Sequence, residues 1–161
     1  MRATRRALGW AEPALWLATW FGAGLLPKMP GTWGSLAALP FAWILVSLGG
    51  PWLLIAAAAA VFLAGLWASD RYMRAVQLHD PAPIVIDEVV AQWLTLAFMP
   101  LDPVIYMLGF FLFRAADVLK PWPASWIDRR VGGPWGVMAD DLVAALYAWL
   151  VLWLVVEWAL P

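Results

Sequence analysis

Acidic residues are concentrated at the ends of the apolar runs of this 161-residue chain. Asp87-Glu88 lies near the start of one run, Asp140-Asp141 precedes another, and Asp117 lies near the end of a third. A charged group beside hydrocarbon is costly unless it has a partner, so each of these acids is a candidate for function. Carboxylate oxygens suit Mg²⁺, which in turn commonly binds substrate phosphates. The five acids therefore predict a Mg²⁺ site that serves an anionic substrate.

Both acidic pairs also have a purely structural interpretation, because carboxylates stabilise the N-terminus of a helix. Two charges inside the apolar stretch 84–90 favour a functional role for Asp87-Glu88. For Asp140-Asp141 both interpretations stay open, since one carboxylate is enough to cap a helix. Asp141 would also share a helix face with small residues that allow close helix approach, namely Ala144, Ala145 and Ala148.

Basic residues close the third apolar run and predict contacts to an anion. Arg114, Asp117 and Lys120 are spaced three apart, which places them on one face of a helix. Arg129 follows in a polar loop, where a guanidinium group could bind phosphate. Arg114, Lys120 and Arg129 are therefore candidate phosphate-binding residues. The alternatives are an ion-pair ladder along one helix and the basic loops that membrane proteins carry on the cytoplasmic side.

Further candidates lie in two loops. Segment 27–35 is rich in glycine and proline, and Thr32 and Ser35 stand where the next helix would begin, which suits phosphate binding. The segment lacks the ending of a P-loop, and a turn with a capping hydroxyl is the structural alternative. His79 is the only histidine and the default candidate for proton transfer near neutral pH, although a single loop histidine often has no such role.

The composition places these residues in a membrane protein with a single domain covering residues 1–161. The chain is 65% hydrophobic and 13% charged, with a mean hydropathy of +0.78, whereas soluble proteins are about 25% charged. A net charge of −1 argues against binding of nucleic acid. The absence of cysteine excludes phosphocysteine chemistry and thiolate zinc sites.

The apolar segments predict an all-α fold, a multi-helix integral membrane bundle with about four to five spans. Segment 14–26 is shorter than the ~20 residues that span a bilayer, and we expect a re-entrant or interfacial N-terminal helix there. Gly49-Gly50-Pro51 should end one helix and start the next. The other expected helices are 35–48, 52–69, 84–99, 103–119 and 142–160.

The distribution of lysine and arginine predicts how this bundle lies in the membrane. If segment 14–26 does not cross, all ten basic residues lie at the N-terminus or in the loops around 28, 70–74 and 114–130. The positive-inside rule then places the N-terminus in the cytoplasm and the C-terminus outside. In this topology three separate helices deliver carboxylates to one cytoplasmic level.

Motifs spread over residues 22–141 give a family resemblance. They are residues 22–25, Pro30-Gly31-Thr32-Trp33-Gly34-Ser35, His79-Asp80, Ile84-Val85-Ile86-Asp87-Glu88, residues 113–123 with Arg114, Asp117 and Lys120, residues 126–131, and Gly136-Val137-Met138-Ala139-Asp140-Asp141. In order and spacing they resemble the phosphatidylglycerophosphatase A family of bacterial inner-membrane lipid phosphatases. The resemblance implies Mg²⁺-dependent hydrolysis of phosphatidylglycerophosphate to phosphatidylglycerol and inorganic phosphate.

The mechanism expected on this basis is metal-assisted hydrolysis of a phosphomonoester at the cytoplasmic face. Asp87, Glu88 and Asp141 are the expected catalytic carboxylates, and His79 is a candidate for proton transfer. Attack by water and attack by an aspartate nucleophile stay open. The competing functions are a small membrane transporter and a non-catalytic membrane subunit whose acids only cap helices. A transporter is expected to carry its charges near the middle of the bilayer instead.

Overall fold

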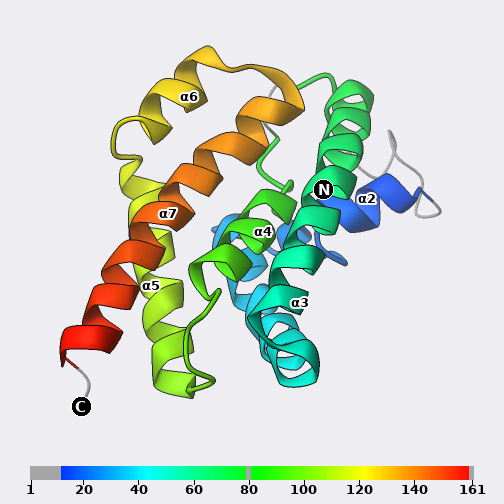
Figure 1. Ribbon diagram of the computed structural model, residues 1–161. Coiled ribbons are helices and arrows are strands. Elements are labelled where there is room, and N and C mark those ends of the chain that lie inside the picture. The colour runs from blue at the N-terminus through cyan, green and yellow to red at the C-terminus, as the bar shows by residue number, and fades with distance from the viewer. Residues whose placement is uncertain (1–11, 79–80, 160–161) are drawn as a thin grey trace.

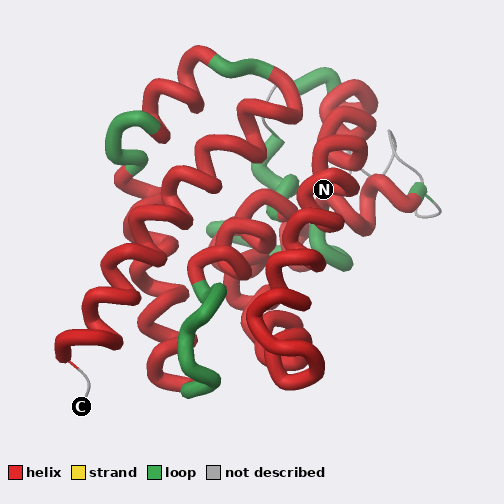
Figure 2. Tube along the Cα trace, viewed as in Figure 1, coloured by secondary structure: helices red, strands yellow, loops and turns green. Residues whose placement is uncertain are grey.

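The structure, a computed structural model, describes residues 12–78 and 81–159, and every regular element in this part of the chain is a helix (Figure 2). This confirms the predicted all-α fold. Figure 1 shows one element in the middle of the molecule, α4, with α3 on one side and the antiparallel pair α5 and α7 on the other. In chain order the elements are α2 (Pro13–Ala18), the 3-10 helix η1 (Ala23–Leu25), α3 (Pro30–Val76), α4 (Ile86–Thr95), α5 (Pro103–Leu119), α6 (Ala124–Arg130) and α7 (Gly133–Ala159).

Helix α3 is interrupted at the glycine pair that the sequence marks as a turn. Gly49 and Gly50 both leave the helical region, and Gly50 has a φ of 69°, which glycine adopts without steric cost. Pro51 follows, and its fixed φ and missing N–H suit the first turn of a new helical stretch. The chain reverses direction here and returns through 51–76 (Figure 1). The predicted turn is therefore confirmed.

The N-terminal segment is too short to cross a membrane, as expected. Helix α2 has six residues and η1 has three, against the ~20 that a spanning helix needs. The segment packs against the loop before α4, where the Val85 N–H donates to the Ala18 carbonyl at 2.9 Å. Gly24 permits this approach, because a Cβ atom there would lie 2.2 Å from the Pro83 carbonyl oxygen. The segment thus holds the start of α4 in place.

Helix α4 is a buried core helix, which differs from the span expected over 84–99. It has ten residues, a length of about 15 Å, which is half of a ~30 Å hydrocarbon layer. Val89 and Val90 are buried, and the Trp93 indole donates a hydrogen bond of 2.9 Å to the Ala38 carbonyl of α3. This burial was not predicted, because a helix surrounded by other helices has the same apolar composition as one that faces lipid.

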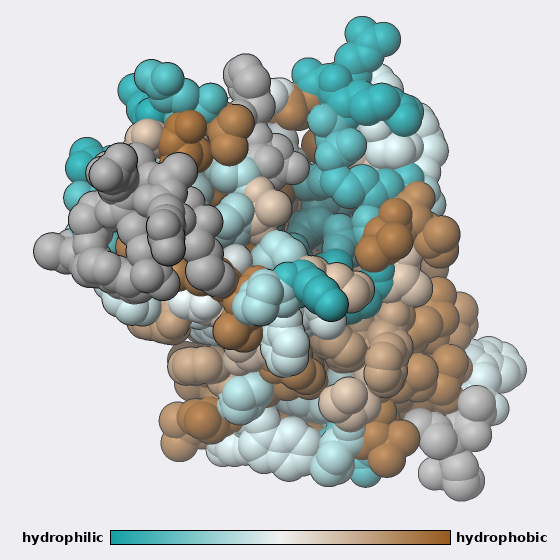
Figure 3. Space-filling view, turned by 180° about the vertical axis from the view of Figure 1, so that it is seen from behind, coloured by the Kyte–Doolittle hydropathy of each residue, from teal (hydrophilic) through white to brown (hydrophobic). Residues whose placement is uncertain are grey.

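The surface divides into a polar end and an apolar remainder. Figure 3 shows hydrophobic side chains over the middle and lower part of one face, and hydrophilic side chains around a hollow above them. Leu48, Trp52, Val104 and Phe111 are 61–76% exposed, which suits contact with lipid. Among the described residues two helices, α3 and α7, are long and apolar enough to cross a membrane. The predicted count of four to five spans is not confirmed by this observation.

Candidate active site

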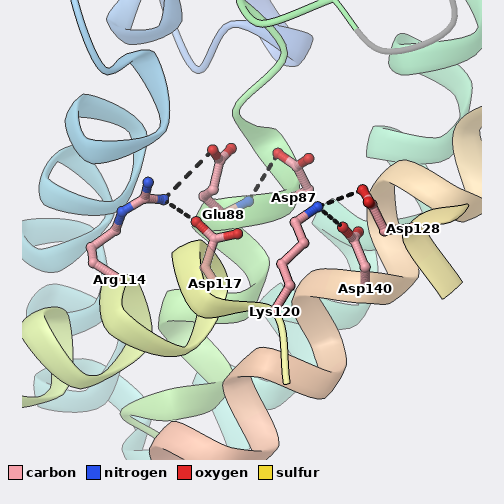
Figure 4. A network of polar contacts seen from close by, with 7 residues as sticks. All are labelled: Asp87, Glu88, Arg114, Asp117, Lys120, Asp128 and Asp140. Atoms are coloured by element: carbon pink, nitrogen blue, oxygen red, sulfur yellow. Dashed lines mark hydrogen bonds and ion pairs between the residues drawn. The ribbon is translucent and has the colours of Figure 1, made fainter. Parts of the chain in front are cut away.

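Asp87 and Glu88 lie in the first turn of α4, where the sequence analysis expected a helix to begin. The Asp87 carboxylate accepts a hydrogen bond of 2.9 Å from the Glu88 N–H, which fixes the direction of its side chain. Figure 4 shows both carboxylates projecting from the same end of α4. The helix start therefore presents two acids to one region of the molecule.

A third carboxylate, from α7, completes a carboxylate cluster made of Asp87, Glu88 and Asp141. Each residue offers one oxygen, and these three oxygens lie within 4.8 Å of one another. Asp87 is 9% exposed and Asp141 is 5% exposed, so their charges repel with little screening by water. Oxygens that coordinate a hard cation at about 2.0–2.6 Å lie up to about 4–5 Å apart. The donor set and its spacing therefore fit a divalent cation such as Mg²⁺.

The position of Asp141 within its helix differs from the expected one. The last helix was expected to begin at residue 142, so that Asp140-Asp141 could have capped it. Helix α7 instead begins at Gly133, so both acids lie about two turns inside it. Pro134 is compatible with this early start, because proline in the first turn of a helix removes no hydrogen bond. The capping interpretation of this pair is therefore wrong.

Arg114 of α5 lies beside the carboxylate cluster. Its Nη1 is 2.6 Å from Asp117 Oδ2, the predicted pair along one helix face, and 3.7 Å from Glu88 Oε1 (Figure 4). The side chains of Arg114 and Asp117 are 16% and 13% exposed. Arg114 Nε is nevertheless buried without a hydrogen-bond partner among the described residues. The guanidinium group is held in place by charge and keeps donors for an anionic ligand.

Gly31 makes this arrangement possible and was not predicted as a site residue. A Cβ atom at this position would lie 2.0 Å from Glu88 Oε1 and 2.9 Å from Arg114 Nη1. A side chain at residue 31 would therefore displace the Glu88 carboxylate and the Arg114 guanidinium group from these positions. The one signal in the sequence was that Gly31 belongs to a segment rich in glycine and proline.

Lys120 occupies a different position from the predicted one on the face of Arg114 and Asp117. It follows the end of α5 with a φ of 43°, in the left-handed region, and Pro121, which cannot continue the helix, comes next. Its Nζ donates to Asp128 Oδ1 at 2.5 Å and to Asp140 Oδ2 at 2.6 Å. Burial by itself would lower the pKa of Lys120, but the hydrogen bonds and charges of Asp128 and Asp140 raise it above its ordinary value. Lys120 thus links α5, α6 and α7 as a stable cation.

These residues share one cavity of about 650 Å³. The volume lies within the range of ~300–1,000 Å³ that is typical of small-molecule sites. Acids and bases from α4, α5, α6 and α7 contribute to its wall, together with Gly31 of α3. Arg129, a predicted phosphate-binding residue, and its neighbour Arg130 also line it. The cavity could therefore hold a charged headgroup beside the carboxylate cluster.

Two predicted residues, Thr32 and Ser35, do not line this cavity, and a third lies outside the described residues. Ser35 is fully buried and its hydroxyl donates to the Gly31 carbonyl at 2.8 Å. The Thr32 hydroxyl is buried without a hydrogen-bond partner among the described residues, and Thr32 does not line the cavity, although Pro30 and Gly31 do. His79 lies outside the described residues. The predicted roles of all three stay predictions.

Comparisons with known proteins match the chain over nearly its whole length. The family model for phosphatidylglycerophosphatase A matches residues 16–156. The phosphatidylglycerophosphatase A of Escherichia coli K12 is 39% identical over 132 residues, which are 81% of this chain and 76% of that protein. The enzyme of the same name from Haemophilus influenzae is 38% identical over 150 residues, 92% of each chain.

A third relative carries a different name. A provisionally named phosphatidylinositol-3-phosphatase from Bacteroides thetaiotaomicron is 35% identical over 144 residues, 84% of this chain and 89% of that protein. No solved structure matches the chain. The family match includes all four helices that supply charged residues to the cavity, α4, α5, α6 and most of α7. The motifs, the site geometry and these matches agree, and the chain belongs to the phosphatidylglycerophosphatase A family.

Proposed function

We propose that this phosphoric monoester hydrolase removes the terminal phosphate of phosphatidylglycerophosphate in a Mg²⁺-dependent reaction at the cytoplasmic face of the bacterial inner membrane. Membership of the family and the names of its relatives support the substrate. The observation that carries the chemistry is the carboxylate cluster beside Arg114, in one cavity at the polar end of the molecule. The products are phosphatidylglycerol and inorganic phosphate.

In the proposed site Asp87, Glu88 and Asp141 hold the cation. When bound, Mg²⁺ supplies neutralisation of the phosphate charge and activation of water. Asp117 and Asp140, which were also predicted as metal ligands, each have a basic partner, Arg114 and Lys120 respectively. Asp117 and Asp140 are thus held in short ion pairs, whereas Asp87 and Asp141 form no ion pair with any described residue and Glu88 has only the 3.7 Å contact to Arg114. The three acids of the cluster are therefore the proposed ligands.

Arg114 is the proposed contact to the phosphate that is transferred. Its guanidinium group lies beside the cluster, with Nη1 3.7 Å from Glu88 Oε1, and its Nε is buried without a partner among the described residues. Donors held rigidly in a dry site stabilise the charge of a phosphoryl transition state. During hydrolysis the bond between phosphorus and the glycerol oxygen breaks, and an oxygen of water takes its place, either directly or after transfer to an aspartate.

The proposed membrane arrangement has five crossings. Four are the two stretches of α3, α5 and α7, and the fifth is made by α4 together with the non-helical segment 96–102 that leads to the start of α5 (Figure 1). The stretches 30–48 and 51–76 follow from the break at Gly49 and Gly50, and α5 has 17 residues, near the lower limit for a span. Helix α7 leads away from the charged cavity toward the opposite end of the molecule (Figure 1). With the basic loops in the cytoplasm, the N-terminus and the cavity lie inside and the C-terminus outside. A midplane charge site, as in a transporter, has no support in this arrangement.

The test is phosphate release from phosphatidylglycerophosphate by purified protein in neutral detergent, with Mg²⁺ and after its removal by a chelator. Phosphatidate, lysophosphatidate and phosphatidylinositol 3-phosphate serve as comparison substrates. We expect Mg²⁺-dependent release that Asp87→Asn and Glu88→Gln abolish while the proteins stay folded. Asp70→Asn is the matched control, because Asp70 pairs with Arg74 outside the cavity. Near-normal turnover in both cluster variants would contradict the proposed metal site.

A further inference from the structure

The basic residues of the cavity wall fall into two groups. Arg114 has Asp117 and Glu88 as partners, and Lys120 has two carboxylates within 2.6 Å. Arg129 and Arg130 are exposed and form no ion pair with any described residue. They are therefore the basic side chains of this wall whose charge has no compensation within the described structure.

The two arginines are linked to the helix of Asp141 through a series of ion pairs. They follow Asp128 in the last turn of α6, and Asp128 is bonded to Lys120 at 2.5 Å. Lys120 in turn contacts Asp140, the neighbour of Asp141 in the cluster (Figure 4). The ion pairs from Asp128 to Lys120 and from Lys120 to Asp140 thus connect the segment that carries the arginines with the helix that carries Asp141.

The segment that carries the arginines is fixed to α7. Val131 follows α6 in an extended conformation, and a Cβ atom at Gly136 would lie 1.9 Å from the Val131 carbonyl oxygen. Only glycine at position 136 allows the chain to pass so close to α7. At the other end of α6, Tyr147 of α7 donates a hydrogen bond of 2.8 Å to the Trp122 carbonyl. The arginines consequently project from an anchored helix end.

We propose that Arg129 and Arg130 form a second anion subsite, which binds the phosphodiester of the lipid while the phosphomonoester lies at the carboxylate cluster. This inference rests on the proposed function. Phosphatidylglycerophosphate carries both groups, joined by a glycerol unit, and only the phosphomonoester is removed. A lipid that is held at its phosphodiester presents the terminal phosphate to the inner site. Guanidinium groups suit this role because their donors match two phosphate oxygens at once.

The subsite explains how such a cavity would select among lipids. Phosphatidate has its phosphomonoester directly on diacylglycerol and has no phosphodiester, so it cannot occupy both positions. Phosphatidylinositol 3-phosphate has both groups on an inositol ring and could occupy both. The arginines would therefore favour lipids with a phosphodiester and a separate phosphomonoester, without contacting the reacting phosphorus.

The test compares two substrates in neutral detergent, where attraction of basic side chains to an anionic surface is minimised. Arg129→Gln combined with Arg130→Gln should lower kcat/KM for phosphatidylglycerophosphate by about tenfold to 100-fold, mainly through KM, as expected for loss of charged hydrogen bonds. Hydrolysis of phosphatidate should be unchanged. Arg74→Gln is the matched control, because Arg74 is 79% exposed, pairs with Asp70 and lies outside the cavity. It should leave both substrates unaffected.

Binding of phosphatidylglycerol tests the subsite independently of phosphate release. Phosphatidylglycerol carries the phosphodiester and no phosphomonoester, and its binding to the full-length protein can be followed by tryptophan fluorescence in neutral micelles. The double variant should weaken this binding at least about tenfold, and Arg74→Gln should not. Equal losses on both substrates, or binding of phosphatidylglycerol that does not depend on the arginines, would overturn the subsite. A wild-type protein that binds phosphatidylglycerol through the arginines yet releases no phosphate from phosphatidylglycerophosphate would instead overturn the proposed function.

Discussion

The cavity wall contains two basic residues near the C-terminal end of α5, Arg114 and Lys120. They differ in whether hydrogen-bond donors remain available to a ligand. Around Arg114, the guanidinium Nη1 lies 2.6 Å from Asp117 and 3.7 Å from Glu88, yet the buried Nε has no hydrogen-bond partner among the described residues. Around Lys120, the ammonium group donates to two carboxylates at 2.5 and 2.6 Å. Arg114 keeps donors for a ligand, whereas Lys120 uses its donors to join three helices.

The difference follows from local conformation and from donor geometry. Arg114 lies within α5, and its planar group has five N–H donors, whereas its contacts to Asp117 and Glu88 are both made by Nη1. Lys120 lies just past the end of α5 in the left-handed region, which turns its side chain toward α6 and α7. Arg114 and Lys120 are both basic and were expected on the same helix face, yet their expected roles differ. Arg114 should bind the ligand, and Lys120 should position other residues.

The largest expected effect is the loss of turnover when one acid of the carboxylate cluster is neutralised. Asp141→Asn keeps the shape of the side chain and removes the charge that a hard cation requires. We expect turnover to fall on the order of 100- to 1,000-fold, which corresponds to several kcal/mol of lost stabilisation by the metal. Binding of Mn²⁺ in place of Mg²⁺, followed by electron paramagnetic resonance, should weaken in parallel.

Asp128→Asn is the control for this prediction on the side of Lys120. The Asp128 side chain is 39% exposed and bonds to Lys120, but it does not belong to the cluster. Its loss should change turnover by less than about threefold, as for other partly exposed ion pairs. If Asp128→Asn weakened Mn²⁺ binding as much as Asp141→Asn, the division into a ligand-binding centre and a structural centre would be wrong.

Arg114→Lys tests whether the free donors of Arg114 matter. The lysine keeps the positive charge beside Asp117 and Glu88, so the fold should be maintained, but it loses the planar arrangement of donors. We expect kcat to fall about 10- to 100-fold, with little change in the melting temperature measured in detergent. Unchanged kcat would show that the positive charge alone is sufficient for turnover and that the unpartnered Nε of Arg114 has no role in it.

Lys120→Met should act mainly on stability. It leaves the 6% exposed Asp140 without its cationic partner. Removing one partner of a buried ion pair costs about 3–5 kcal/mol, and because the Lys120 side chain is 32% exposed we expect less, about 1–3 kcal/mol. The melting temperature should fall by roughly 2–8 °C, and kcat should fall less than in Arg114→Lys. Adding Asp140→Asn should restore much of the stability, and no such rescue would contradict a structural role for this pair.

The sequence predicted the convergence of acids better than it predicted the helices that carry them. The meeting of Asp87, Glu88 and Asp141 is confirmed. Acids at the ends of apolar helices are excluded from the hydrocarbon layer, so they gather at the polar end of the molecule. The helix expected over 84–99 has only ten residues and packs inside the protein. This was not predicted, because apolar composition does not distinguish contact with lipid from contact with neighbouring helices. The start of α7 was also missed, since Gly133 and Pro134 favour a turn as readily as a first helical turn.

Other contacts between distant segments could not be predicted from the sequence. Lys120 and Asp140 are twenty residues apart, and no periodicity predicts that they meet. The requirement for glycine at position 31 depends on Glu88 of α4 and Arg114 of α5, which approach only in the folded protein. Such residues belong to the site through packing, whereas the local pattern of hydroxyls around Gly31 pointed to Ser35 instead.

The smallest expected effect concerns that hydroxyl. Ser35 is fully buried, and its Oγ donates to the carbonyl of Gly31 within the first turns of α3. A serine that bonds to the carbonyl four residues earlier contributes little to helix stability. Ser35→Ala should therefore change kcat/KM for phosphatidylglycerophosphate by less than about twofold and the free energy of unfolding by less than about 1 kcal/mol. A loss of tenfold or more in kcat/KM with unchanged stability would show that Ser35 reaches the phosphate after all, and that the Arg114 side of the cavity extends into α3.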